Sequence, residues 1–531
     1  MFPVTDSASA RPAMAPAKIN RNAAPLVRIG CGQGGIFLRR SLPIFYSAML
    51  LTGVHLLLRF VGTSFQVYVS GKIGAAGVGL LQLVLSVGSL ATVAGIAGIR
   101  TTTMYLTAEE LGKNKHINVV WVLSGCFGYS ILCSGAIAVA LYWFAPEIAS
   151  RWIGNPETIP ALRLFAAFLP VVCMTGVMTG YFTAANRIGT LAAVEVAEQL
   201  LCMGLTILAL KFFAGSSPAK ACLCIILGSG SASVFTLLCL VLLRLQEHPT
   251  HGERIPIGRR LLDAAVPLAT ADVLKSGINT TENLMVPKRL SLCRLVSDPL
   301  AAFGMVSGMV FPVLMFPACI LFGLTELLIP ELARCSAAGS HRRIRYLTKR
   351  SLRVALLYGL IFGGLEFLLA DMLCLRLYNN SEAGQYLQLY ALLIPMLYCD
   401  AITDAMTKGL GQQKICVRYN ILTSALDVII LFLLLPEYGM MGYFVSFTIT
   451  HLINFVLSLR RLLKITDQSL PFYVPAFSIS AAMAATLGAM QFSSPIGKSV
   501  SYLGLLGSLL FLFRITGWED ITWLRGLLRK K

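Results

Sequence analysis

Charged residues are scarce in this 531-residue sequence, at 13%, whereas soluble domains carry about a quarter. Hydrophobic residues make up 56%, and the mean hydropathy is +0.74. A water-soluble globule cannot bury that much apolar surface, but a lipid bilayer accepts it. The short alternating segments of a membrane β-barrel are missing. Since lipid offers no partners to backbone polar groups, long apolar runs there must be helical. The composition therefore predicts an all-α membrane protein.

Several other signatures are missing as well. There is no zinc-ligand spacing, no RNP-like run and no basic–aromatic patch, so the net charge of +19 is not interpreted as nucleic-acid binding. Residues 1–36 contain no apolar core of signal-peptide length, and residues 1–37 are interpreted as a disordered cytoplasmic tail. The 14 cysteines fall mostly inside apolar segments and are interpreted as packing residues. No metal and no cofactor are expected.

What the chain does contain is a series of apolar windows. A window of about 20 residues, rising 1.5 Å per residue, is long enough to cross the hydrocarbon core. Fourteen such windows predict fourteen membrane spans, at 42–62, 77–99, 118–144, 161–184, 190–213, 220–243, 262–286, 303–329, 351–374, 384–406, 416–435, 439–459, 472–492 and 497–516.

Positive charge separates the two sides of this arrangement. Most of the 44 Lys and Arg fall in alternate loops, which predicts a cell-membrane protein with both termini in the cytoplasm. Lys288, Arg289 and Arg294 are the exception, because they fall on the outer side. We interpret Lys288 and Arg289 as residues at the mouth of a cavity.

The spacing of loops indicates two similar halves. Pro43 opens the first half and Pro267 the second, and a basic linker separates them. Two six-helix bundles with two appended helices are typical of a transporter. The predicted parts are an N-lobe at 38–243, a linker at 244–261, a C-lobe at 262–460, and a final helix pair with a basic tail at 461–531.

Prolines and isolated polar residues mark particular spans. Pro312 and Pro317 within one window predict a kinked helix. Asp427 is interpreted as a partner of a neighbouring helix, Asp400 as interfacial, and the lone His55 as no metal ligand.

Arg59 lies near the end of the first predicted span. A charge inside a span is costly unless it faces a wet cavity or a partner. Its guanidinium could bind a phosphate in a bidentate manner, or it could extend to the membrane interface. Both interpretations remain open from the residues alone.

The seventh span is the most polar. Asp272, Lys275 and Glu282 share one helical face, and Asn279 adds to the stripe. Such a stripe favours a water-filled cavity in which Lys275 meets an anion, while Asp272 or Glu282 neutralises it or carries a proton. A structural ion pair between the two halves is the alternative.

An ordered series of short motifs resembles a known family. The motifs are LRFVG (58–62), IGAAGVGLLQ (73–82), ENLMVPKRL (282–290), GMVSGM (304–309), LIPEL (328–332), NILTSALD (420–427) and PEYGMMGY (436–443). The series resembles the stage V sporulation protein B branch of the polysaccharide exporters, within the multidrug/oligosaccharidyl-lipid/polysaccharide (MOP) flippase superfamily. Glu282 replaces the family's usual Asp, and Lys288 replaces an Arg.

The resemblance implies a flippase that moves an undecaprenyl-pyrophosphate-linked saccharide, a peptidoglycan precursor for spore cortex or cell wall, by alternating access. It implies that Arg59 and Lys275 bind the pyrophosphate and that residues 472–516 hold the lipid tail. Membrane lipids and cell-wall synthases are the partners it suggests, with no nucleic acid.

Two other functions are alternatives to a flippase. A drug/cation antiporter of the same fold uses carboxylates in its first lobe, but the first span has none. A membrane glycosyltransferase or polymerase needs catalytic or metal-binding carboxylates near the membrane surface, and no Asp-x-Asp pair or long external loop is present. An enzyme is therefore not expected.

Overall fold

The computed structural model describes residues 34–112, 118–213, 217–246, 257–469, 473–513 and 515. Within these ranges the secondary structure is helical, with no strand. Contacts divide the chain into Met1–Ser47 and Ala48–Lys531, and the description below concerns the second unit. The predicted tail and the middle of the predicted linker lie outside the described residues, except that helix α1 already begins at Gly34.

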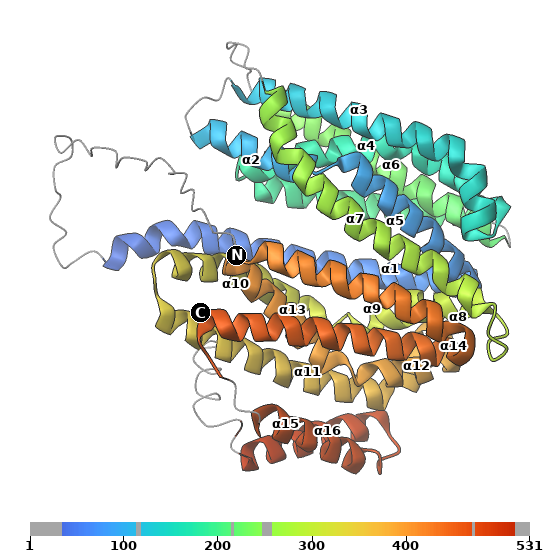
Figure 1. The fold of residues 1–531 in the computed structure, drawn as a ribbon, viewed down its shortest axis with the longest axis vertical. Helices are drawn as coiled ribbons and strands as arrows, with labels where there is room; N and C mark the ends of the chain where they lie inside the picture. The colour runs from blue at the N-terminus through green and yellow to red at the C-terminus, as the bar shows by residue number, and fades with distance from the viewer. Residues whose placement is uncertain are drawn as a thin grey trace, which may run out of the picture. The chain divides into compact units, whose positions relative to one another are not determined.

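The first half of the chain contributes six α-helices and two short elements (Figure 1). In chain order they are α1 (Gly34–Ile96), α2 (Ile99–Gly112), α3 (Asn118–Glu147), the π-helix η1 (Ile148–Ile153), the 3-10 turn η2 (Pro156–Thr158), α4 (Ile159–Ala184), α5 (Ile188–Phe213) and α6 (Pro218–Leu245).

The second half follows with α7 and a series of broken helices (Figure 1). They are α7 (Gly258–Leu290), α8 (Pro299–Met305), the π-helix η3 (Val306–Val310), α9 (Phe311–Leu314), α10 (Ala318–Ala337), α11 (His341–Tyr378), α12 (Ser381–Ala391), α13 (Ile394–Gly409), α14 (Gln413–Thr466), α15 (Tyr473–Ala489) and α16 (Pro495–Leu512).

Helix α14 folds back on itself at a glycine. Its 54 residues would extend about 81 Å if straight, far beyond a hydrocarbon core of about 30 Å. Gly439 has φ 55° and ψ −134°, a conformation open essentially to glycine alone. The Ser446 hydroxyl consequently donates to Asp427, 19 positions earlier, at 2.5 Å. α14 is therefore two antiparallel arms.

Helix α1 folds back in the same way at Gly74, where φ is 69°. Gln66 Nε2 donates to the Gly308 carbonyl at 3.2 Å, and Val78 also lies against Gly308. A straight helix would separate positions 66 and 78 by about 18 Å, so both arms approach one point on η3.

Length and hydropathy identify eight helices that can cross a membrane, or ten when two bent pairs are each taken as one span. The helices Leu57–Leu111 and Gln413–Thr466 each contain a fold-back. α7 is too polar, and α15 with 17 residues is too short, to be among those eight. Counting both arms of each folded helix, both bent pairs, α7 and α15 gives fourteen segments. The predicted all-α membrane fold is confirmed.

The helices pack in groups that follow the chain. α2, α3, α4, α5 and α6 contact one another, and α10 to α14 form a second set (Figure 1). α7 packs along α14 and also contacts α2 and α3. The pair α15 and α16 packs on α11. α7 therefore contacts helices of both halves.

The predicted kink at Pro312 and Pro317 is confirmed. α8–α9 and α10 meet at 65°. Two tyrosines donate to backbone carbonyls at the break: Tyr398 Oη donates to Leu314 O at 3.2 Å, and Tyr358 Oη donates to Pro317 O at 2.7 Å. The kink is thus held by side chains of α11 and α13.

Candidate functional site

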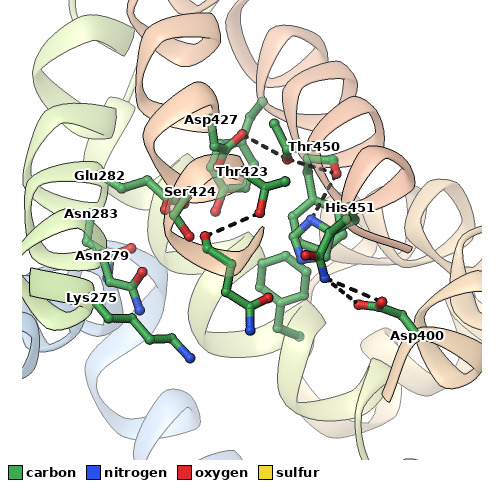
Figure 2. A pocket seen from close by; sticks show the side chains of 15 residues that line it. Lys275, Asn279, Glu282, Asn283, Asp400, Thr423, Ser424, Asp427, Thr450 and His451 are labelled. Atoms are coloured by element: carbon green, nitrogen blue, oxygen red, sulfur yellow. Dashed lines mark hydrogen bonds between the residues drawn. The ribbon is translucent and has the colours of Figure 1, made fainter. Parts of the chain in front are cut away.

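A polar cavity of about 390 Å³ lies among α7, α9, α13 and both arms of α14 (Figure 2). We call it the polar cavity. Its lining consists mostly of polar side chains together with two phenylalanines and one tyrosine: Lys275, Asn279, Glu282, Asn283, Phe311, Asp400, Asn420, Thr423, Ser424, Asp427, Tyr443, Phe447, Thr450, His451 and Asn454.

Asp427 is the acid of this cavity that accepts hydrogen bonds from two different side chains. Its side chain is only 6% exposed. Oδ1 accepts from Ser446 Oγ at 2.5 Å and from Thr450 Oγ1 at 3.2 Å, both on the returning arm of α14. The fold-back at Gly439 is what brings these donors to the carboxylate. A buried charge needs such partners, so the hairpin is a precondition for the site.

Glu282 of α7 faces Asp427 closely enough for the two carboxyl groups to interact directly (Figure 2). α7 packs along α14 at this level. Two ionised carboxylates in contact repel each other, so a proton or a monovalent cation between them stabilises the pair. The arrangement can therefore hold a proton or a monovalent cation.

A third acid and a histidine lie on the far side of the polar cavity from Glu282 (Figure 2). Asn454 Nδ2 donates to Asp400 Oδ2 at 3.1 Å. His451 Nδ1 lies 2.9 Å from Phe447 O, and its ring stacks on Phe447 with centroids 3.9 Å apart. α13 turns the Asp400 side chain into the polar cavity, and its interpretation as an interfacial residue stays a prediction.

Lys275 is exposed and lines the polar cavity together with Asn279 and Glu282. Asp272 is also exposed but is not among the lining residues. Among the residues that the structure describes, no ion pair joins Lys275 to a carboxylate within 4.0 Å. The structure thus brings together three of the four predicted residues of the seventh span.

Arg59 lies elsewhere, on the first arm of α1. The helix continues for fifteen residues beyond Arg59 to the kink at Gly74, about 22 Å, so the position of Arg59 near the end of the first span stays a prediction. Its exposed guanidinium reaches the Cys319 thiol near the start of α10. The adjacent Phe60 contacts Phe316, with ring centroids 6.0 Å apart. Arg59 is therefore well inside the first arm and faces the α9–α10 break.

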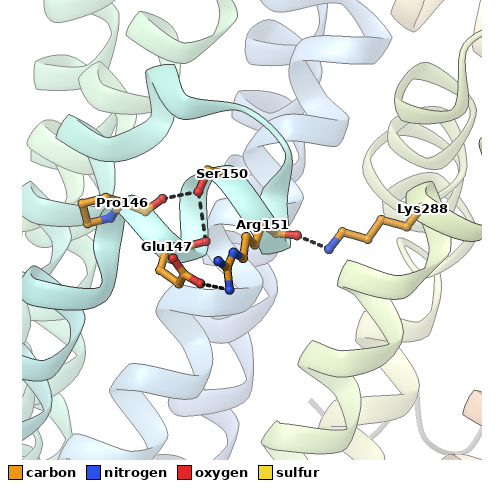
Figure 3. Close-up of polar contacts among 5 residues, drawn as sticks. All are labelled: Pro146, Glu147, Ser150, Arg151 and Lys288. Atoms are coloured by element: carbon orange, nitrogen blue, oxygen red, sulfur yellow. Dashed lines mark hydrogen bonds and ion pairs between the residues drawn. The ribbon is translucent and has the colours of Figure 1, made fainter.

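Lys288 and Arg289 lie at the C-terminal end of α7. Lys288 Nζ donates to the backbone carbonyl of Arg151 in η1 (Figure 3). Arg289 donates from Nε and Nη2 to Phe432 O, at 3.2 and 2.7 Å, and its guanidinium lies 3.6 Å from the Phe432 ring centroid. Both line a second cavity, which is mainly apolar.

Sequence reasoning missed Asp400, Asp427 and His451 as members of one site. A signal was present for the first arm of α14, since Asn420, Thr423, Ser424 and Asp427 follow the spacing i, i+3, i+4, i+7 of one helical face. Within the described residues no group of three or more His, Cys, Asp and Glu could hold a metal ion.

The MatE family model matches the chain over residues 52–208 and 267–433, more than half of its length. The chain belongs to the MatE family. The two matched stretches of this MatE-family protein lie one in each predicted lobe. The chain is 21% identical to stage V sporulation protein B of Bacillus subtilis (strain 168) over 496 residues, covering 89% of this chain and 96% of that protein.

Sporulation protein YkvU of the same organism is 24% identical over 264 residues, covering 48% of this chain and 59% of YkvU. Among solved structures, the lipid II flippase MurJ in an inward closed conformation gives a TM-score of 0.65 at 13% identity, covering 89% of this chain and all of that one. An inward-facing multidrug resistance MATE transporter of the MOP superfamily gives 0.61 at 14%, covering 80% of this chain and all of that one.

The resemblance drawn from the sequence motifs is thereby confirmed: this MatE-family protein is a multi-pass membrane transporter or flippase of the MOP superfamily, related to stage V sporulation protein B.

Proposed function

We propose that this MatE-family protein is a flippase that moves a pyrophosphate-linked saccharide lipid across the cell membrane by alternating access. The proposed substrate is an undecaprenyl-linked peptidoglycan precursor used in spore cortex or cell-wall synthesis. The observation that carries the proposal is Arg59, an exposed guanidinium far from the helix end at Gly74, with no carboxylate paired to it in the described structure. A pyrophosphate crossing the bilayer needs such a cation.

A groove for the lipid tail supports the same function. Between α11, α12, α13, α15 and α16 lies a mainly apolar cavity of about 370 Å³, lined in part by the region 472–516 predicted to hold the lipid tail. Tyr502 Oη donates to Leu360 O at 2.7 Å, so the phenol holds α16 against α11. Gly364 lies against the same phenol, where a side chain would collide with it. The proposed groove holds a polyprenyl chain.

In this proposal the Glu282–Asp427 pair is the coupling site, and Lys275 meets the anionic headgroup. The lobes at 38–243 and 262–460 rock about the substrate, both termini lie in the cytoplasm, and cell-wall synthases receive the product.

A drug/cation antiporter is the second candidate function, favoured by the polar cavity itself. Glu282, Asp400 and Asp427 line it with Lys275 and His451, so acids outnumber the fixed cation there. Such a lining suits a cationic substrate as well as a coupling ion.

Reconstitution into vesicles separates the two functions. A panel of fluorescent lipids would carry the same saccharide on a pyrophosphate, on a monophosphate or on a neutral linkage. We expect translocation of the pyrophosphate lipid, and a strong loss for the neutral one. Exchange of a cationic dye for protons, with no lipid movement, would instead establish an antiporter.

A further inference from the structure

α7 separates the polar cavity from a second cavity on its opposite face. This apolar groove, as we call it, has a volume of about 850 Å³, within the range of sites that bury small ligands. It shares no lining residue with the polar cavity. Its lining is Leu90, Trp152, Val273, Leu274, Gly277, Ile278, Thr280, Thr281, Leu284, Met285, Lys288, Arg289, Ala425 and Val428.

Two cations lie at one end of the apolar groove, and each is held by a backbone carbonyl. Lys288 has three N–H donors and uses one on Arg151 O (Figure 3). Arg289 has five and uses two on Phe432 O. No carboxylate forms an ion pair with either side chain in the part of the chain that the structure describes. Both cations therefore keep fixed, unused donors for an anion.

The lining of the groove suits an amphiphilic ligand, with an anionic group and a hydrocarbon chain. Its wall along α7 is mainly aliphatic, from Val273 and Leu274 through Ile278 to Leu284 and Met285, with Thr280 and Thr281 among them. A hydrated free anion gains nothing from this wall, and a neutral hydrocarbon gains nothing from the two cations. Phosphate suits a lysine and an arginine together, and a tryptophan such as Trp152 suits the boundary between headgroup and chain.

We propose that the apolar groove binds a membrane phospholipid with an anionic headgroup, its phosphate on Lys288 and Arg289 and an acyl chain along α7. The walls come from α1 and η1 in the first half of the chain and from α14 in the second. A bound lipid therefore contacts both halves and restrains their separation. This site is distinct from the proposed substrate route, and it stands whether or not the proposed flippase activity does.

Trp152 provides the test. A variant that keeps Trp152 as its only tryptophan would be reconstituted in phosphatidylcholine vesicles doped with bromine-labelled phosphatidylglycerol or bromine-labelled phosphatidylcholine. Bromine quenches tryptophan on contact. We expect phosphatidylglycerol to bind in the groove about five-fold more tightly than phosphatidylcholine, because one basic residue attracts an anionic lipid by about 1 kcal/mol. Equal quenching by the two lipids would overturn the proposal, and so would displacement of the lipid by millimolar inorganic phosphate alone.

Variants locate the binding. A Cβ at Gly277 has no atom within 4 Å, so Gly277→Leu places a side chain in the groove, and Ala425→Phe fills it from the other wall. Both should abolish the preferential quenching. Gly204→Leu on α5, also at an open position, is the matched control and should leave it intact.

Lys288→Gln and Arg289→Gln together should remove the preference for phosphatidylglycerol while quenching by phosphatidylcholine persists. A preference that survives both groove-filling variants, in protein that unfolds at the usual temperature, would place the lipid elsewhere and refute the site.

Discussion

Ser446 donates a hydrogen bond of 2.5 Å to Asp427, although 19 positions separate them along one helix. The bond exists because α14 reverses at Gly439 and returns alongside itself. Thr450 adds a second donor from the returning arm at 3.2 Å. The acid in the wall of the polar cavity therefore depends on a turn twelve residues away.

Removing the Ser446 donor should destabilise the protein. Ser446→Ala leaves a buried carboxylate one hydrogen bond short, at a cost of about 1–3 kcal/mol. Thermal unfolding in detergent measures this loss. Ser480→Ala is the matched control, because Ser480 bonds only its own helix, at Ala476 O, and is exposed. Equal unfolding temperatures for the two variants would contradict the role given to Ser446.

A side chain at Gly439 should weaken the fold-back. Gly439→Ala forces a non-glycine residue into φ 55°, ψ −134°, and its Cβ would lie 3.1 Å from Val296. We expect a loss of about 1–3 kcal/mol in the free energy of unfolding. Gly204→Ala is the control, because Gly204 lies in a regular helix with open space around it, and this substitution should not measurably lower the free energy of unfolding. An unchanged Gly439 variant would mean that the turn tolerates a side chain.

Reversing the charge of Arg59 should abolish translocation of a pyrophosphate-linked lipid while folding and insertion are kept. Arg59→Gln should lower the transport rate about ten- to a hundred-fold, which corresponds to the loss of one charge-assisted hydrogen bond. Arg59→Lys should retain part of the transport rate. Arg163→Gln is the control, since Arg163 stacks on Tyr142 at 4.9 Å on another helix. Normal transport by the Arg59→Glu variant would remove this residue from the substrate route.

Lys275 should be accessible to water. In a background freed of native cysteines, Lys275→Cys should react with a membrane-impermeant thiol reagent, because the side chain is exposed and lines the polar cavity. Ala265→Cys, at a fully buried position of the same helix, should not react. Complete protection of position 275 under all conditions would favour a buried structural ion pair.

Glu282→Gln should uncouple transport from its driving ion. The substitution keeps the shape of the side chain but removes one of the two carboxyl groups that face each other across α7 and α14. Translocation should then lose its dependence on an imposed proton or sodium gradient. Asp272→Asn, exposed and outside the polar cavity, should retain it. Retained gradient dependence in the Glu282 variant would assign coupling to another group.

Much of the fold could be predicted because the bilayer restricts the choices. Apolar windows of sufficient length must be helices, since lipid cannot satisfy the backbone, and the polar stripe of the seventh span already indicated a wet environment around Lys275 and Glu282. The kink at Pro312 and Pro317 followed from the missing N–H groups of proline.

Residue partners across the bundle could not be predicted in this way. Asp400 seemed interfacial from its place in a window, but its exposure is decided by the rotation of α13. The sequence could not show that Arg59 reaches the Cys319 thiol, because that contact joins the first arm of α1 to α10 across 260 positions. Lys288 and Arg289 interrupted the charge bias, and only their contacts with Arg151 and Phe432 show what they line.

The sequence by itself determined that the chain is a helical membrane protein with fourteen apolar windows and an unusually polar α7, because those properties depend on local composition and the solvent. The tertiary structure alone decided which polar faces meet, since helix rotation and the turns at Gly74 and Gly439 are set by packing between distant segments. Asp427 thereby faces Glu282, and the opposite face of α7 is left to an apolar groove.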